Sequence, residues 1–188
     1  MRSTKEDLIL NAAKSLFVRF GFEKMTMNDI AREAGVARQT VYNRFDSKDA
    51  IFVTLVRERM EQLRAELHAA WTETNSVSEM IDAFLRVVPI AWFDEASTFS
   101  NPGEMIDRLN RLATDEMQSF AAEVINNIAG HLEGEAAFGS GALDRFSFAE
   151  NFYWSTVNAK YGARDRADFM KRIETTRAMA LIVLGTDT

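Results

Sequence analysis

The sequence contains no cysteine and only two histidines, His68 and His131. The lack of cysteine excludes disulfides, thiolate metal sites and a cysteine nucleophile. The histidines lie far apart, and neither belongs to a Glu-x-x-His or a His-Glu-x-x-His sequence. A phosphate-binding Gly-x-x-x-x-Gly-Lys sequence is absent as well. We therefore expect no metal site, no cofactor and no enzymatic activity.

Long apolar runs are also missing. No run approaches the roughly 20 residues that a membrane-spanning helix needs, and the N-terminal residues lack the apolar centre of a signal peptide. We therefore expect a cytoplasmic protein. Prolines are rare, since only Pro89 and Pro102 occur in 188 residues, of which 47% are hydrophobic and 27% charged. This composition is typical of a globular chain, and because strand-like alternation is absent we predict an all-α fold.

Taken alone, the overall charge of −6 argues against a nucleic-acid partner. The charge is unevenly distributed. Residues 1–50 hold nine Lys and Arg against seven Asp and Glu, a net +2, and the remaining residues hold thirteen against twenty-one, a net −8. A mildly basic N-terminal part can still approach phosphate groups, while the acidic remainder is repelled.

Residues 26–45 have the pattern of two short helices joined by a tight turn. Thr26 and Asp29 have the spacing of a capping box at the start of the first helix. Gly35 suits the turn, because glycine adopts a positive φ at little cost. The apolar stripe of the first helix has helical spacing and consists of Ile30, Ala31 and Ala34.

The second helix of this pair has an apolar side formed by Val41 and Phe45, which leaves its polar side chains facing outward. Arginine suits the guanine edge, and glutamine or asparagine suits the adenine edge. This favours a DNA-reading helix-turn-helix, and the alternative is a purely structural corner between two helices. The outward side chains are Arg38, Gln39, Thr40, Tyr42 and Asn43.

Residues 5–56 resemble the N-terminal domain of the tetracycline-repressor (TetR) family. The resemblance lies in Ala-Ala-Lys-Ser-Leu-Phe, Gly-Phe, Thr-Met-Asn-Asp-Ile-Ala-Arg-Glu-Ala-Gly-Val and Thr-Val-Tyr-Asn-Arg-Phe-Asp-Ser-Lys-Asp, in this order. It implies a three-helix DNA-binding domain with a helix-turn-helix over residues 1–47. It also implies a helical ligand-binding and dimerisation domain over residues 48–188, with a long helix at 48–71 that joins the two and moves when ligand binds.

The resemblance also bears on the DNA contacts. Tyr42 matches the family's phosphate-contacting tyrosine, and Lys48 lies at a helix N-terminus, where backbone N–H groups attract phosphate. Ala37 stands where a capping serine is common, Gln39 replaces a frequent glycine, and Asn43 replaces a usual histidine or tyrosine. The residues that we expect to bind DNA are Thr26, Arg38, Gln39, Thr40, Tyr42, Asn43 and Lys48.

Further helices are expected in the body of the chain. Ser76 and Glu79 form a possible capping box, and Pro89 should kink or end the helix that follows. Asn101 and Pro102 start another helix, which reaches about residue 132 with a break near residue 114. Glycines at 134, 139 and 141 indicate a loop, and the last helices are expected at 142–161 and 165–184.

Large apolar side chains of the body supply two further predictions. An apolar ligand cavity is the first. The second is a four-helix dimer interface made by the terminal hairpin, as the resemblance implies. The predicted ligand-binding residues are Trp71, Met80, Phe84, Trp92, Phe93, Met105, Met117, Phe120 and Phe152. The predicted dimer contacts are Phe148, Phe152, Ile173, Ala180, Leu181 and Leu184.

The sequence thus predicts a homodimeric transcriptional repressor that binds a pseudo-palindromic DNA operator and is released by a small apolar or aromatic ligand. Three alternatives remain open: an activator on the same fold, a DNA binder without a ligand, and a helical interaction protein that has lost DNA binding.

Overall fold

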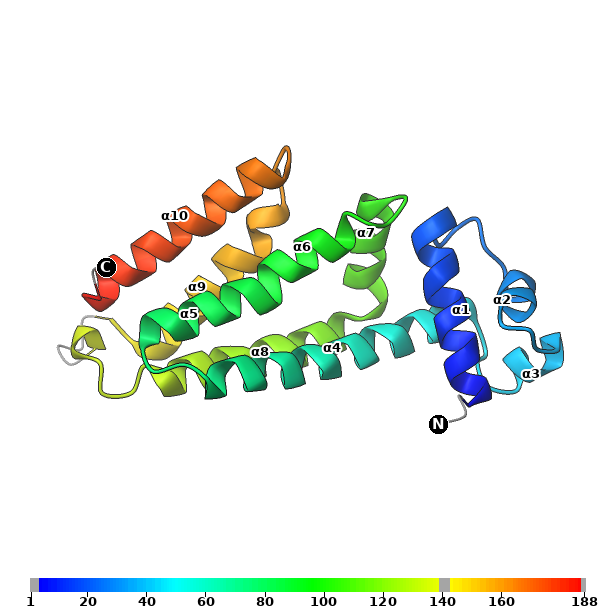
Figure 1. Cartoon of the computed structure of the whole chain (residues 1–188), viewed down its shortest axis with the longest axis horizontal. Coiled ribbons are helices and arrows are strands. Elements are labelled where there is room, and N and C mark those ends of the chain that lie inside the picture. The colour runs from blue at the N-terminus through cyan, green and yellow to red at the C-terminus, as the bar shows by residue number, and fades with distance from the viewer. Residues whose placement is uncertain (1–3, 139–142, 187–188) are drawn as a thin grey trace. The chain divides into compact units, whose positions relative to one another are not determined.

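The computed structural model describes residues 4–138 and 143–186, in which helices are joined by loops and turns and no strand occurs (Figure 1). The predicted all-α fold is confirmed. Within these ranges, no helix combines the length and the apolar character that crossing a membrane requires. The α-helices are α1 (Lys5–Phe20), α2 (Met27–Glu33), α3 (Arg38–Tyr42), α4 (Lys48–Thr72), α5 (Val77–Leu85), α6 (Ala91–Ala96), α7 (Pro102–Leu112), α8 (Thr114–His131), α9 (Arg145–Val157) and α10 (Arg166–Leu184).

The chain divides into two compact units. The first comprises residues 1–61 and 94–117, and the second comprises residues 62–93 and 118–188. The boundaries therefore fall inside α4, α6 and α8, and α7 belongs to the same unit as the N-terminal helices. This division differs from the predicted boundary between residues 47 and 48.

In the first unit, α1, α2 and α3 begin close to the predicted positions. Thr26 and Asp29 form the capping box that the spacing predicted, and Thr4 and Asp7 form another at the start of α1; each satisfies backbone N–H groups at a helix start. The aromatic rings of Phe17, Phe22 and Phe52 join α1, the following loop and α4, with centroids 5.0 to 6.0 Å apart. Fully buried aliphatic side chains complete this core: Ile9, Ile30, Val41 and Ile51.

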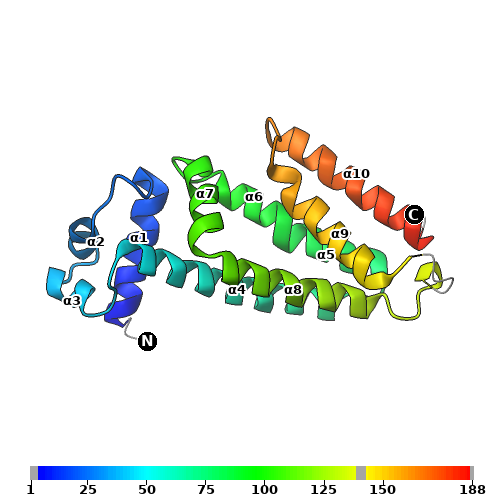
Figure 2. The ribbon, with the colours of Figure 1, turned by 180° about the vertical axis from the view of Figure 1, so that it is seen from behind.

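In the second unit, α9 and α10 lie side by side, and α10 also contacts α5 (Figure 1 and Figure 2). Phe84 of α5 is fully buried, and its ring lies 5.6 Å from that of Phe152 and 5.9 Å from that of Tyr153, both on α9. The ring of Phe93 stacks on Phe169 of α10 at 4.1 Å. Aromatic packing therefore links α5, α6, α9 and α10 within this unit.

Pro89 neither ends its helix nor opens a gap before α6. It lies in a π-helical turn, η1 (Arg86–Ile90), that connects α5 directly to α6. Proline lacks an N–H group and clashes with the carbonyl of the preceding turn, and a locally wider turn relieves both. The sequence predicted a disturbance at this position, and the structure shows that the helical path continues through it.

Several other helix ends depart slightly from the predictions. Ser76 caps α5 as expected, but the Glu79 carboxylate accepts a hydrogen bond from the N–H of Asn75 at 2.7 Å instead of closing the box on Ser76. Helix α9 begins at Arg145 and ends in a short 3-10 turn, η3 (Asn158–Lys160). The predicted helix start at 142 and the loop glycines at 139 and 141 lie outside the described residues.

Candidate nucleic-acid interface

The corner between α2 and α3 depends on Gly35. Its φ is +65°, in the left-handed region that residues with a side chain rarely adopt. The chain reverses here with two backbone hydrogen bonds, from the N–H of Gly35 to the carbonyl of Arg32 at 3.3 Å and from that of Val36 to Ala31 at 3.0 Å. The corner therefore fixes where α3 begins.

Helix α3 is held from its apolar side. Val41 is fully buried and Phe45, just after the helix, is 6% exposed. The inward and outward faces therefore follow the predicted pattern. The polar side is accessible: Arg38, Gln39, Tyr42 and Asn43 are exposed, and Thr40 is half-buried.

The exposed side chains of α3 are ordered in pairs one helical turn apart. The Arg38 guanidinium lies 5.2 Å from the centroid of the Tyr42 ring and donates a hydrogen bond to its hydroxyl at 3.5 Å. The amide of Gln39 donates to the side-chain carbonyl of Asn43 at 2.8 Å. Because these contacts already restrict the side chains, less conformational entropy is lost when the side chains bind another surface. The result is a short row of donors and acceptors, with Arg38 as its cation.

The hydroxyl of Thr26 already makes the hydrogen bonds that cap α2. It donates to the Asp29 carboxylate at 2.7 Å and accepts from the Asp29 backbone N–H at 3.3 Å. The hydrogen bond from this hydroxyl is the main reason why the pKa of Asp29 lies below its ordinary value. Thr26 therefore fixes the start of α2, and a phosphate contact from it stays a prediction.

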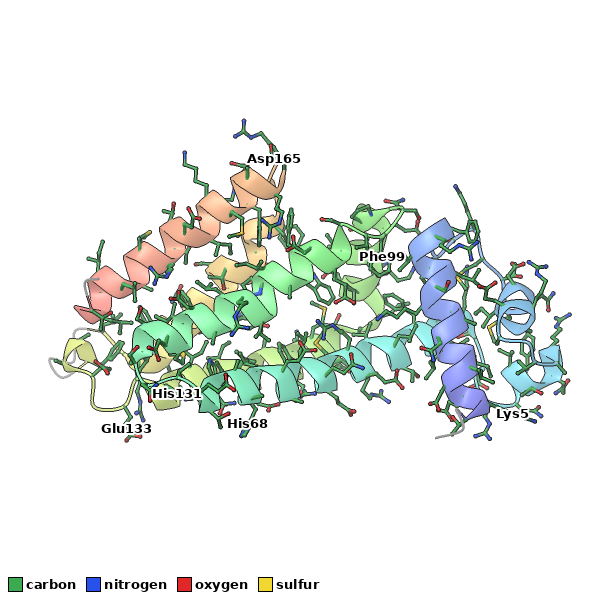
Figure 3. The ribbon with its side chains drawn as sticks, viewed as in Figure 1. Lys5, His68, Phe99, His131, Glu133 and Asp165 are labelled. Atoms are coloured by element: carbon green, nitrogen blue, oxygen red, sulfur yellow. The ribbon has the colours of Figure 1, made fainter. Side chains whose placement is uncertain are left out.

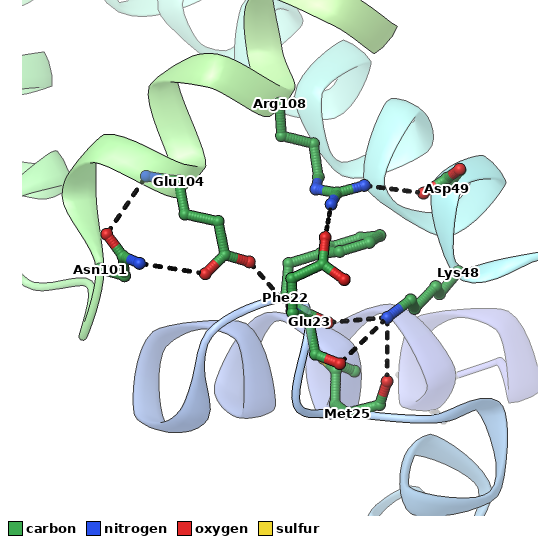
Figure 4. A network of polar contacts seen from close by, with 8 residues as sticks. All are labelled: Phe22, Glu23, Met25, Lys48, Asp49, Asn101, Glu104 and Arg108. Carbon is green, nitrogen blue, oxygen red and sulfur yellow. Dashed lines mark hydrogen bonds and ion pairs between the residues drawn. The ribbon is translucent and has the colours of Figure 1, made fainter.

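Lys48 has a structural role that the sequence did not reveal. Its ammonium donates to the backbone carbonyls of Phe22, Glu23 and Met25 at 2.9, 3.5 and 3.1 Å (Figure 4). It also lies 4.4 Å from the centroid of the Phe22 ring. The side chain thus ties the loop between α1 and α2 to the start of α4, and we leave it out of the proposed DNA contacts.

Arg108 of α7 holds the same loop from another side. It is only 8% exposed, and its guanidinium lies 3.6 Å from the centroid of the Phe22 ring. One nitrogen pairs with the Glu23 carboxylate, and another pairs with Asp49 at 3.2 Å (Figure 4). We call Arg108, Phe22, Glu23 and Asp49 the Arg108 cluster. Because Asp49 lies in the first turn of α4, the cluster connects α7, the α1–α2 loop and α4.

The start of α7 reinforces this arrangement. Asn101 caps the helix by accepting a hydrogen bond from the Glu104 N–H at 3.2 Å, and the Glu104 carboxylate accepts from the backbone N–H of Glu23 at 2.9 Å. The backbone N–H of Ser100 also donates to the carbonyl of Val18 at 3.0 Å. The sequence predicted the helix start at Asn101, but it missed the contacts of Glu104 and Ser100 with residues 18 and 23, because partners separated by about 80 positions leave no local pattern.

The predicted ligand-binding residues fall into different environments. Trp71, Met80, Phe84, Phe120 and Phe152 are buried, whereas Trp92, Phe93, Met105 and Met117 are half-buried. Met105 and Met117 belong to the first unit and the others belong to the second. The set is therefore not one cluster within a single unit, and the ligand contacts stay a prediction.

A pocket of about 290 Å³ lies between α4 and α8 in the second unit. Trp71 is the only predicted ligand residue in its wall, and both histidines of the chain line it (Figure 3). Some of its polar side chains already have partners within the pocket wall: Arg64 pairs with Glu123 at 2.6 Å, and Nδ1 of His131 is hydrogen-bonded to the carbonyl of Asn127 at 2.8 Å. Among the described residues, no group of three or more His, Asp or Glu side chains could hold a metal ion.

The predicted dimer residues are mostly interior. Phe152, Ile173, Ala180, Leu181 and Leu184 are buried within the chain itself, and Phe148 is half-buried. These side chains are therefore not available at the surface of one copy. Large apolar side chains on the same two helices are exposed instead: Phe146, Trp154, Met179, Ile182 and Val183.

Comparison with known proteins agrees with the resemblance. A family model described as "Bacterial regulatory proteins, tetR family" matches residues 9–55, which contain α2, the Gly35 corner and α3. The HTH-type transcriptional regulator AlkX of Mycobacterium tuberculosis is 29% identical over 85 residues, which are 45% of this chain and 39% of AlkX. The curated relatives that the chain matches are thus aligned over only part of their length, between 30% and 62%. They are named as transcriptional regulators and not as enzymes, as the sequence predicted.

Solved structures extend the likeness over nearly the whole chain. A transcriptional regulator from Cytophaga hutchinsonii has a TM-score of 0.73 at 16% identity, with 98% of each chain covered. SmeT, the repressor of the Stenotrophomonas maltophilia multidrug efflux pump SmeDEF, has a TM-score of 0.63 at 21% identity, with 98% of this chain and 90% of SmeT covered. At these identities the likeness concerns the fold. The helix-turn-helix of α2 and α3 thus lies within residues that match the tetR family model, and the whole chain shares the fold of solved regulators described as members of that family.

Proposed function

We propose that the protein is a sequence-specific DNA-binding transcriptional regulator that acts as a homodimer. The observation that carries this proposal is the exposed polar row on α3, which Val41 and Phe45 hold from the buried side. A recognition helix of this kind enters the major groove with its side chains toward base edges. Binding to chromosomal DNA also implies that the protein works in the cytoplasm.

The proposed base contacts come from Arg38, Gln39 and Asn43. The Arg38 guanidinium can donate two hydrogen bonds to the guanine edge, and an amide side chain can both donate to and accept from adenine. The hydrogen bond between Gln39 and Asn43 leaves the Gln39 carbonyl and an N–H of each amide for such a contact. Tyr42 and Thr40 are proposed to bind the neighbouring phosphates.

The dimer is proposed to form through α9 and α10. Met179 and Ile182 of α10 are 62% and 68% exposed, and Trp154 of α9 is 40% exposed. Apolar side chains at such spacing on paired helices suit a two-fold contact with a second copy. Two recognition helices about 34–36 Å apart, or a multiple of this distance, could then enter successive major grooves.

We also propose that the protein is a repressor released by a small ligand with an apolar or aromatic part. The description of SmeT as a repressor supports this choice, as do the aromatic side chains of the second unit. A ligand can lower DNA affinity only by as much as it prefers one conformation of the dimer over the other.

Selection of binding sites from a pool of randomised DNA duplexes tests the proposal. We expect the purified chain to enrich an inverted repeat with half-sites one or more helical turns apart. Arg38→Ala should relax one guanine position and weaken binding by about 1–3 kcal/mol. Arg111→Ala, which removes an exposed arginine of α7, is the control and should select the same repeat. If wild type enriches no sequence, the protein does not read DNA.

A further inference from the structure

Lys160 is a cation without a visible acceptor. It ends the 3-10 turn η3 and is half-buried, with its ammonium 5.6 Å from the centroid of the Trp92 ring and 5.2 Å from that of Tyr161. Within residues 4–138 and 143–186, no carboxylate or carbonyl accepts a hydrogen bond from this ammonium. Burial lowers the pKa of Lys160, since the charged form loses its hydration. Aromatic faces compensate for this loss only in part.

Trp92 of α6, whose ring the Lys160 ammonium faces, supplies a second donor. Its indole nitrogen Nε1 is buried and has no hydrogen-bond partner among the residues that the structure describes. Buried N–H groups are nearly always paired, because an unpaired one loses its bond to water without compensation. Here the unpaired N–H belongs to the ring that the Lys160 ammonium faces.

Further aromatic side chains lie next to these two residues in the sequence. Phe93 follows Trp92 on α6, and its ring stacks on Phe169 of α10 with an interplanar angle of 8°. Tyr161, next to Lys160, is 47% exposed. All of these residues belong to the second unit. The unit thus combines one cation, one neutral donor and apolar rings, and the donors lack an acceptor.

We infer that Lys160 and Trp92 form the anion-binding end of a site for a small carboxylic acid with an apolar body. The carboxylate oxygens would accept hydrogen bonds from the ammonium and the indole N–H, which are the two groups that lack acceptors. The apolar part of the acid would lie against the neighbouring rings. A single cation matches one negative charge, whereas a phosphate group would require additional positive side chains or N–H groups.

This inference deepens the proposed function by naming the class of ligand. Only its regulatory consequence rests on the proposed repressor activity, because binding of the acid is measurable without DNA. Octanoate and phenylacetate are suitable probes, with octanamide and phenylacetamide as neutral counterparts of the same shape. Calorimetric titration of the full-length chain should show binding of at least one acid and an affinity at least about tenfold lower for its amide, as expected for loss of a charge-assisted hydrogen bond.

Variants then assign the contact to these two residues. Lys160→Met keeps an apolar stem without the charge, and Trp92→Phe keeps a ring without the N–H. Each should lower the affinity for the acid by about tenfold and that for the amide by less, because the amide carbonyl is an uncharged acceptor. Lys171→Met removes an exposed lysine of α10 and should bind the acid as wild type does. The melting temperature of Lys160→Met should not fall, because the buried charge carries a desolvation cost.

The outcomes separate the inference from the proposed function. Equal binding of acid and amide, no binding of any probe, or unchanged binding by both Lys160→Met and Trp92→Phe would overturn the carboxylate site. If the acid binds as expected but leaves the affinity for the selected DNA unchanged, the site stands and the ligand-released repressor fails. If neither acid binds although the protein selects a DNA repeat, the DNA-binding proposal stands and this inference fails.

Discussion

Arg108 shows how much one side chain contributes to the position of the helix-turn-helix. Charged residues are seldom buried unless they are paired. Arg108 is buried, lies against the Phe22 ring and pairs with Glu23 and Asp49, although its own Nε has no partner. The partners Glu23 and Asp49 are considerably more exposed than Arg108 itself. We therefore attribute its contribution chiefly to stacking on Phe22 and to the link that it makes with the α1–α2 loop.

Arg108→Ala is expected to lower the free energy of unfolding by about 1–3 kcal/mol, because it removes both the stacking and the ion pairs. Arg108→Met keeps part of the packing and should cost less. Urea denaturation measures both effects, and hydrogen exchange at the Glu23 amide should become faster. Arg111→Ala on the exposed side of α7 is the control, with an expected change within about 0.5 kcal/mol. Equal effects of Arg108→Ala and Arg111→Ala would contradict this role.

Local and long-range residues differ in how well the sequence reveals them. The capping pair Thr26 and Asp29 and the turn at Gly35 could be predicted, because each depends on neighbours within a few positions. The contacts of Arg108 could not, since its partners lie 59 and 85 positions away. For the same reason, the sequence led us to expect a DNA contact from Lys48, although its ammonium binds carbonyls at positions 22, 23 and 25.

Among the elements, α3 is short and lacks a side-chain cap. It spans Arg38–Tyr42, and its N-cap residue Ala37 has extended backbone angles and makes no capping hydrogen bond. The N–H groups of the first turn therefore depend on the backbone and on solvent. The sequence predicted this missing cap, because alanine stands at a position where a hydroxyl would serve.

Ala37→Ser should raise the free energy of unfolding by about 1 kcal/mol, since the serine oxygen can accept a hydrogen bond from the first turn of α3. Thermal denaturation followed by circular dichroism measures the gain. The matched control is Ala65→Ser, an exposed position inside α4, where serine should lower stability by a few tenths of a kcal/mol through helix propensity. If Ala37→Ser is no more stable than Ala65→Ser, α3 gains nothing from a cap.

The start of α10 depends on a carboxylate. Asp168 accepts hydrogen bonds from the backbone N–H and the guanidinium of Arg164, and these lower its pKa from 3.8 to about 2. A carboxyl group whose pKa is lower in the folded state than in the unfolded state stabilises the fold at pH values above its unfolded-state pKa. This contribution is lost as the pH falls from that value through about 2.

Asp168→Asn should therefore slightly lower the melting temperature at neutral pH, and the difference from wild type should disappear as the pH falls toward 2. Melting curves across this pH range measure the effect. Asp107→Asn, at an exposed position of α7, is the control and should follow wild type throughout. A difference between Asp168→Asn and wild type that persists undiminished at the lowest pH would exclude the carboxylate as its cause.

At the scale of the whole molecule, the sequence predicted the positions of the helices along the chain better than it predicted which helices pack together. Helical spacing indicates which residues face inward, but it does not tell which helices pack together. The position of α7 in the first unit depends on the contacts of Arg108 and Glu104 with the α1–α2 loop and the start of α4. No local sequence pattern predicts these contacts. Likewise, α10 is apolar on two sides, and the sequence did not distinguish the buried side, with Ile173 and Leu184, from the exposed side, with Ile182.

The exposed side of α10 yields the last prediction, which concerns the dimer. Wild type should sediment as a dimer at micromolar concentration, and Ile182→Glu should raise the dissociation constant at least about thirtyfold, because a carboxylate at the centre of an apolar interface loses its hydration. Helical content should stay unchanged, since Ile182 is 68% exposed in the single chain. Leu8→Glu, at an exposed apolar position of α1, should remain dimeric. If Ile182→Glu dimerises as wild type does while Leu8→Glu dissociates, the two-fold contact involves α1, and the spacing of the recognition helices must be derived again from that interface.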